Sequence, residues 1–160
     1  MSLTGTVYCD CVEHNRLRIP HPLPELLFID DSGYPDIRSA NFEQEVLHDK
    51  WEAQNPCLHT DFRLVEYWLG NVAAIGQIRD RIEKLSESTA TPYSILSSKV
   101  IYNGSHSGDF LTPDEVVQLR DELCSLQKVN SLKDAQFNEF MQKLQDLINK
   151  SMSVGKPIAF

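Results

Sequence analysis

The chain has 160 residues, of which 41% are apolar and 24% charged, so it is long enough to bury the core of one soluble domain. It carries 23 acidic and 15 basic residues, and the net charge of -8 argues against a nucleic-acid binder, because a phosphate backbone requires a basic face. No apolar run approaches the roughly 18 residues of a membrane helix, and residues 1–6 lack the features of a secretory signal, so we expect no membrane association and a cytoplasmic location.

The first segment with strand character is Thr6–Val12, where β-forming residues alternate with other types. From 13 to 38 the chain is rich in proline and turn residues, and only the apolar run Leu26–Ile29 predicts a further short strand. His21 lies between two prolines, which predicts an extended and exposed segment, with the histidine as an ordinary surface residue.

A helix is predicted from Asn41 to Gln54. Asn41 can act as the N-cap, and Gln44 stands three residues later, as in a capping box. The apolar side chains recur at helical spacing and predict a buried face, made of Phe42, Val46, Leu47 and Trp51.

The segment Phe62–Leu85 allows two interpretations. Its apolar residues keep nearly one helical stripe, which favours a single helix. The alternative is a strand over Phe62–Trp68, followed by a helix that Asn71 caps. We leave both open.

In the second half, Ile95–Tyr102 reads as a strand. The strongest helix start in the chain follows at Thr112, which is suited to the N-cap, with Pro113 in the first turn. Glu115 completes a capping box and adds negative charge at the positive end of the helix dipole.

The last helix is predicted over Lys133–Ser151 from a regular stripe of large apolar residues, and Gly155 ends it. Residues 157–160 read as a terminal edge strand. Helices and short strands do not alternate regularly, so residues 1–160 should form a single α+β domain. We expect a small, mostly antiparallel sheet of about four strands packed against three or four helices.

Polar side chains are densest in the loop before the helix at Thr112. Ser105, His106, Ser107, Gly108 and Asp109 bring an imidazole, two hydroxyls and a carboxylate together, next to a helix N-terminus. Such residues often only hydrogen-bond their own backbone to make a turn, so a structural loop is the simplest interpretation. A binding loop formed by these five residues is the second interpretation.

A catalytic loop is the third interpretation, with His106 and Asp109 as candidates, because a carboxylate can orient an imidazole for acid–base chemistry. This hypothesis requires a concave pocket beside the loop and a third polar group, for which Tyr8, Asp10 and Glu66 are candidates. The corresponding function would be a small hydrolase or a ligand-binding enzyme.

The four cysteines are Cys9, Cys11, Cys57 and Cys124. In a reducing compartment they are most simply small buried thiols, and we therefore expect no metal and no cofactor. Cys9 and Cys11 would share one face of a strand, and with Cys57 and His59 they offer an alternative metal site. The C-x-C and C-x-H spacings differ, however, from the usual C-x2–4-C pairs of structural zinc sites.

A resemblance covers about the last 60 residues. The segment His106–Val116, with its H-S-G-D loop and P-x-[DE]-V helix start, is similar to a motif of small uncharacterised bacterial proteins. The downstream Leu119, Glu122 and Leu123 fit it too, and Leu147–Phe160 resembles the tail of that group. Some of these proteins are predicted to be immunity proteins of polymorphic toxin systems.

The resemblance implies a bacterial cytosolic protein that acts by binding another protein. With the acidic composition, it favours a cognate basic protein or toxin as the partner, steered to an acidic surface. Protein binding of this immunity type is our first hypothesis, and the small enzyme using His106 and Asp109 is the alternative.

Overall fold

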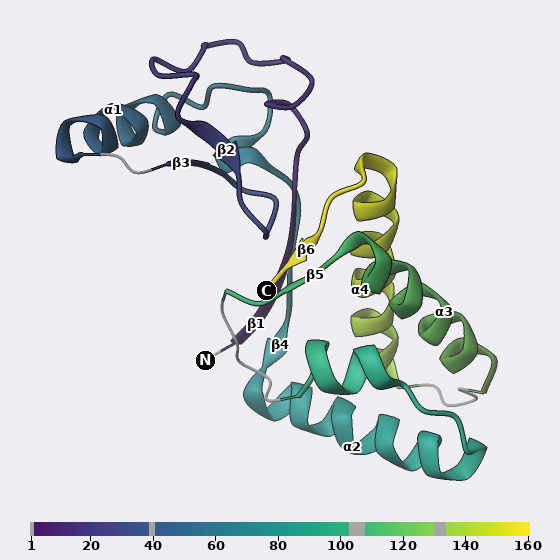
Figure 1. Ribbon diagram of the computed structural model, residues 1–160. Coiled ribbons are helices and arrows are strands. Elements are labelled where there is room, and N and C mark those ends of the chain that lie inside the picture. Colours follow the sequence, from purple (N-terminus) through teal and green to yellow (C-terminus); the bar gives the residue numbers. More distant parts are fainter. Residues whose placement is uncertain (1, 39–40, 103–107, 130–133) are drawn as a thin grey trace.

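The computed structural model describes residues 2–38, 41–102, 108–129 and 134–160. It is an α+β fold, which confirms the fold class expected from the sequence. The chain divides visibly into a main body and a smaller lobe at one end (Figure 1). We call residues 9–62 the N-terminal lobe.

The main body is built on a four-stranded antiparallel sheet with the strand order β4-β1-β6-β5. Its strands are β1 (Ser2–Tyr8), β4 (Arg63–Asn71), β5 (Phe110–Leu111) and β6 (Ile158–Ala159). The pairing of β1 with β4 runs from Ser2 opposite Asn71 to Tyr8 opposite Arg63. These two strands form the longest part of the sheet, and the lobe grows from one end of their pairing.

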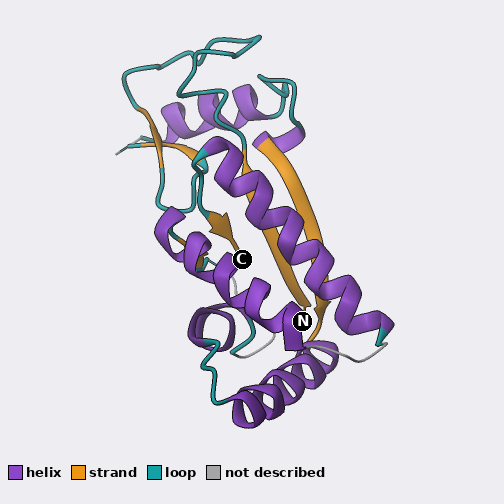
Figure 2. Ribbon diagram, turned by 90° about the vertical axis from the view of Figure 1, so that its right-hand side faces the viewer, coloured by secondary structure: helices purple, strands orange, loops and turns teal. Residues whose placement is uncertain are grey.

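The helices of the main body are α2 (Val72–Thr89), α3 (Pro113–Val129) and α4 (Ala135–Val154). α4 lies across one face of the sheet, with α2 and α3 beside it (Figure 2). Apolar residues of the helices and strands, including Leu3, Val7 and Leu144, bury one large core between them. No helix in the described part of the chain is long and apolar enough to cross a membrane.

The N-terminal lobe contains a hairpin, a helix and a short 3-10 turn. These are β2 (Leu27–Ile29), β3 (Pro35–Ile37), α1 (Phe42–Glu52) and the turn Thr60–Phe62. Its core is small and is formed by Trp51, Phe62 and three cysteines. The lobe therefore has much less buried apolar surface to stabilise it than the main body has.

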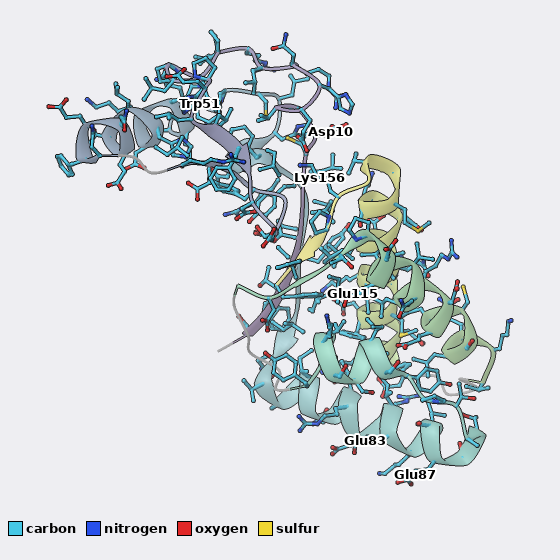
Figure 3. All side chains as sticks on the ribbon, viewed as in Figure 1. Asp10, Trp51, Glu83, Glu87, Glu115 and Lys156 are labelled. Atoms are coloured by element: carbon cyan, nitrogen blue, oxygen red, sulfur yellow. The ribbon has the colours of Figure 1, made fainter. Side chains whose placement is uncertain are left out.

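Lys156 joins the two parts. Its side chain is buried, and its ammonium pairs with Glu13 and donates to the carbonyl of Gly33 at 3.3 Å. Figure 3 shows Lys156 at the boundary between the lobe and the main body. Because an unpaired buried ammonium is costly, this contact fixes the lobe against the end of α4.

The predicted helix boundaries that depend on local caps are confirmed. Asn41 and Gln44 form the expected capping box at the start of α1. Thr112 and Glu115 exchange side-chain to backbone hydrogen bonds at the start of α3. Gly155 ends α4 in the left-handed conformation, with φ of 65°.

For residues 62–85 the second interpretation is correct. The segment forms β4 and then α2, and Asn71 accepts a hydrogen bond from the Ala74 N–H at 2.9 Å as the N-cap. The backbone of β4 is held by pairing with β1, which supplies hydrogen bonds that the helical stripe does not reveal. β1 itself begins at Ser2 and ends at Tyr8, earlier than predicted.

Of the two strand predictions in the second half, the terminal strand is confirmed as β6 except for its place in the sheet, and the strand over Ile95–Tyr102 is wrong. Residues Leu96–Val100 form a helical turn, because the Glu122 carboxylate accepts hydrogen bonds from the N–H groups of Ile95 and Leu96, both at 2.9 Å. This carboxylate caps the turn as it would cap a helix. β6 lies between β1 and β5, so it is not the expected edge strand.

The predicted buried face of α1 is also wrong. Phe42 is 78% exposed and Leu47 is 42% exposed, whereas Trp51 is buried. His48 takes the inward position instead, because α1 packs on the polar and aromatic interior of the lobe rather than on the main core. Helical spacing alone does not indicate which face has a partner.

His21 is 5% exposed, which corrects the prediction of a surface residue. Its Nδ1 accepts from the Leu23 N–H at 3.0 Å, so its Nε2 carries the proton and donates to His48 Nδ1 at 3.1 Å. His48 Nε2 then faces Glu52 at 3.3 Å. One backbone N–H thus sets the tautomers of both histidines.

We expect the free energy of unfolding to fall at acidic pH, because His21 binds a proton more readily in the unfolded chain than in the folded one. Burial lowers the pKa of His21 below its ordinary value, and the neighbouring His48 lowers it further. Below about pH 6.5 the unfolded chain binds a proton that the folded chain refuses, so stability decreases by up to about 1.4 kcal/mol per pH unit in that window. Urea unfolding of the wild type and of His21→Gln, from about pH 7.5 to about 5.5, measures the difference in slope. An equal slope in both proteins would contradict this assignment.

The α3 cap offers a second stability test. Thr112→Ala removes the hydroxyl that accepts from the Glu115 N–H at 3.3 Å, and should cost about 1 kcal/mol in the free energy of unfolding. Thr112→Ser keeps the hydroxyl and is the matched control. If chemical denaturation shows the two variants to be equally destabilised, the cap does not stabilise α3 as proposed.

Candidate functional site

The loop singled out from the sequence is only partly in view. Ser105, His106 and Ser107 lie outside the described residues. Gly108 has φ of 85° and donates its N–H to the Phe160 carbonyl at 3.0 Å, while the Phe160 N–H donates to the Asp109 carbonyl at 2.8 Å. Two backbone hydrogen bonds therefore hold Gly108 and Asp109, the described end of the loop, against Phe160.

Asp109 accepts a hydrogen bond from the Tyr102 hydroxyl at 2.6 Å and borders a small cavity of about 280 Å³. None of the three proposed helper residues (Tyr8, Asp10, Glu66) lines that cavity. Tyr8 and Glu66 instead lie on the paired strands β1 and β4. The catalytic role of His106 and Asp109 stays a prediction, without a third polar group from these candidates.

A more open cleft of about 500 Å³ lies where the N-terminal lobe meets the paired strands. It is lined from four directions: the end of β1, the turn between β2 and β3, the last turns of α1, and the start of β4. The lining residues are Tyr8, Tyr34, Asp49, Glu52, Ala53, Asp61 and Arg63.

Two tyrosine rings form one side of the cleft. Tyr8 and Tyr34 meet edge to face, with ring centroids 5.0 Å apart. The Tyr34 hydroxyl donates to Glu52 at 2.5 Å, and burial together with this carboxylate raises the pKa of Tyr34. Glu52 also contacts His48, which in turn hydrogen-bonds His21. These buried contacts hold the Glu52 side of the cleft in place.

The charges in the cleft are unbalanced. Asp49, Glu52 and Asp61 supply three carboxylates against the single guanidinium of Arg63. Arg63 is already paired with Asp61 at 3.7 Å and with Glu66 at 3.1 Å. Asp49 is exposed and has no ion pair or side-chain hydrogen bond with the described residues. A positive group that entered here would find a free carboxylate beside two aromatic rings.

A larger groove of about 810 Å³ follows α4 beside β4 and has a different character. Its lining consists mainly of amide side chains, and its charged groups have partners. Tyr67 donates to Asp146 at 2.8 Å, and Lys143 pairs with Glu139 at 2.6 Å. Its charged lining residues, Glu139, Asp146 and Lys143, are thus engaged with other side chains, which distinguishes this groove from the smaller cleft.

The structure brings together all four donors of the alternative metal site. Cys9, Cys11, Cys57 and His59 place their ligand atoms within 4.8 Å of one another. The three thiols are buried, as expected, whereas Cys124 is exposed. Burial, together with the nearby thiols of Cys11 and Cys57, raises the pKa of the Cys9 thiol to about 12.

Sequence reasoning missed the cleft itself. Tyr34, Asp49 and Asp61 stand far apart in the chain and belong to no motif. The sequence suggests Tyr8 only as a third polar group beside the His106 loop. The cleft arises because the lobe folds back on β1 and β4, which is a long-range arrangement without a local signal.

Comparison of the chain with family models, curated proteins and solved structures gives no match. Its role therefore has to be argued from its own geometry.

Proposed function

We propose that this protein is a binding module that receives a cationic side chain of a basic partner protein in the cleft between Tyr8, Tyr34 and Asp49. The observation that carries the proposal is the combination of one aromatic side, formed by two tyrosine rings, with an excess of carboxylates, one of which has no partner among the described residues. Aromatic faces and carboxylates attract the same kind of group, a guanidinium or an ammonium.

The shape and position of the cleft support a protein side chain as the occupant. Its volume of about 500 Å³ accommodates an arginine or lysine side chain with room for flanking atoms. The whole chain has a net charge of -8, which would accelerate the approach of a basic partner and orient it.

The proposed module is of the immunity type suggested by the resemblance of its C-terminal part. An immunity protein acts by stoichiometric docking and needs no catalytic group, which agrees with a cleft that holds carboxylates but no activated nucleophile. The partner would be a bacterial toxin that presents a basic surface, and co-expression with a neighbouring toxin-like gene would then protect the cell.

The cleft can be tested with a defined probe. A fluorescein-labelled tetra-arginine amide should bind the purified full chain, as measured by fluorescence polarisation at low salt. Asp49→Asn combined with Asp61→Asn removes two exposed carboxylates from the cleft and should weaken binding about tenfold, because each exposed ion pair contributes up to about 1 kcal/mol.

Glu83→Gln combined with Glu87→Gln is the matched control. These residues are exposed on α2, away from the lobe (Figure 3), and the change removes the same charge. It should alter binding less than about twofold, since only long-range attraction is lost. Equal weakening by both double variants would show that the probe senses net charge alone, and would rule out the cleft as its site.

A further inference from the structure

Four potential metal ligands lie close together in the N-terminal lobe: Cys9, Cys11, Cys57 and His59. They come from two segments that are far apart in sequence: one follows β1 and the other precedes the turn before β4. Just beyond the paired strands β1 and β4, the Cys9 N–H donates to the Phe62 carbonyl at 2.8 Å and brings the two segments together. The donors therefore meet because the two strands pair.

The distances fit a tetrahedral ion. Zinc with bonds of about 2.3 Å to sulfur and about 2.0 Å to nitrogen separates two sulfurs by about 3.8 Å, and a sulfur from a nitrogen by about 3.5 Å. The Sγ atoms of Cys9 and Cys57 are 3.8 Å apart, too far for a disulfide. His59 Nδ1 lies 3.4 Å from Cys11 Sγ and 3.9 Å from Cys57 Sγ.

The backbone also contributes to the site at the Cys57 sulfur. The His59 N–H donates to Cys57 Sγ at 3.4 Å, two residues back in the chain. An N–H directed at sulfur stabilises the thiolate form that binds metals. The C-x-H segment thus supplies a backbone donor to the Cys57 sulfur as well as the imidazole of His59.

We infer that Cys9, Cys11, Cys57 and His59 bind one structural zinc ion. Three thiolates and an imidazole are ligands that zinc prefers, whereas Mg²⁺ and Ca²⁺ prefer oxygen. Four protein donors complete the tetrahedron, and the three cysteines are at most 3% exposed, so no position is open for a substrate or water. The ion holds the fold together and takes no part in a reaction.

The site explains how so small a lobe stays folded. Apart from these cysteines, the fully buried apolar side chains of its core are Trp51 and Phe62 among the described residues. A zinc ion that ties the segment after β1 to the segment before β4 adds stability that this small apolar core does not supply. Removing the ion should unfold the lobe while the main body keeps its own core.

Metal content is the first test. The full chain purified without chelators should carry one zinc per chain by elemental mass spectrometry. Replacing the zinc with cobalt(II) should give the intense visible absorption of a tetrahedral thiolate site. Cys11→Ser and Cys57→Ser should lower the zinc content to background. Cys124→Ser, at the exposed cysteine on α3, is the matched control and should keep one zinc.

A second measurement covers the case in which a ligand variant fails to fold. The two tryptophans differ, since Trp51 is buried in the lobe and Trp68 is 54% exposed on β4. In a Trp68→Phe background, chelation should shift the Trp51 emission to the red, and equimolar Zn²⁺ should restore it while Mg²⁺ should not. Far-UV circular dichroism should show that the helices of the main body persist.

The inference is overturned if the wild-type chain contains no zinc and binds no added cobalt with tetrahedral spectra. It is also overturned if Cys124→Ser loses zinc as Cys57→Ser does. Neither result depends on the arginine probe, so failure of the zinc site and failure of the proposed binding function are separately visible.

Discussion

The pairing of β1 with β4 is the constraint on which the rest of the structure depends. At one end, Ser2 stands opposite Asn71 and the pair is covered by α4 and α2. At the other end the strands leave the sheet and carry the lobe, beginning with the hydrogen bond from Cys9 to Phe62. The pairing of β1 with β4 thus positions the residues of the main core. It also places the three thiols next to His59 and positions Tyr8 and Arg63 in the cleft.

The main body and the N-terminal lobe are stabilised by different interactions. The main body buries a large continuous core between its sheet and three helices. The lobe has to rely on directed interactions, such as the Trp51 indole N–H that donates to the Ile19 carbonyl at 2.9 Å, the histidine chain to Glu52, and the Lys156 contact. Polar networks of this kind specify one arrangement only when every member is satisfied, and a four-ligand ion is the strongest such interaction.

The sequence predicts those features that local chemistry determines. The caps at Asn41, Thr112 and Gly155 act within one turn, so the helix ends that they mark are correct. β4 is ambiguous because its apolar residues fit a helix equally well, and only β1 decides the outcome. The burial of His21 is missed because its partner His48 lies in a distant segment. The four donors Cys9, Cys11, Cys57 and His59 are named from the sequence only as an alternative site, because spacing rules are written for donors on one local motif.

The same geometry orders the two proposals. Tyr8 immediately precedes Cys9, and Asp61 follows His59 by two residues, so the proposed zinc ligands and the cleft residues adjoin one another in the same short segments. The ligands are buried and tie these segments together, whereas the cleft residues project from them at the surface. Loss of the ion would therefore release the cleft, because its walls would no longer be held at a fixed separation. Substitutions in the cleft would leave the ion bound, because Asp49 and Asp61 are not among the four donors. The two proposals together therefore predict that partner binding would depend on the metal, whereas metal retention would not depend on partner binding.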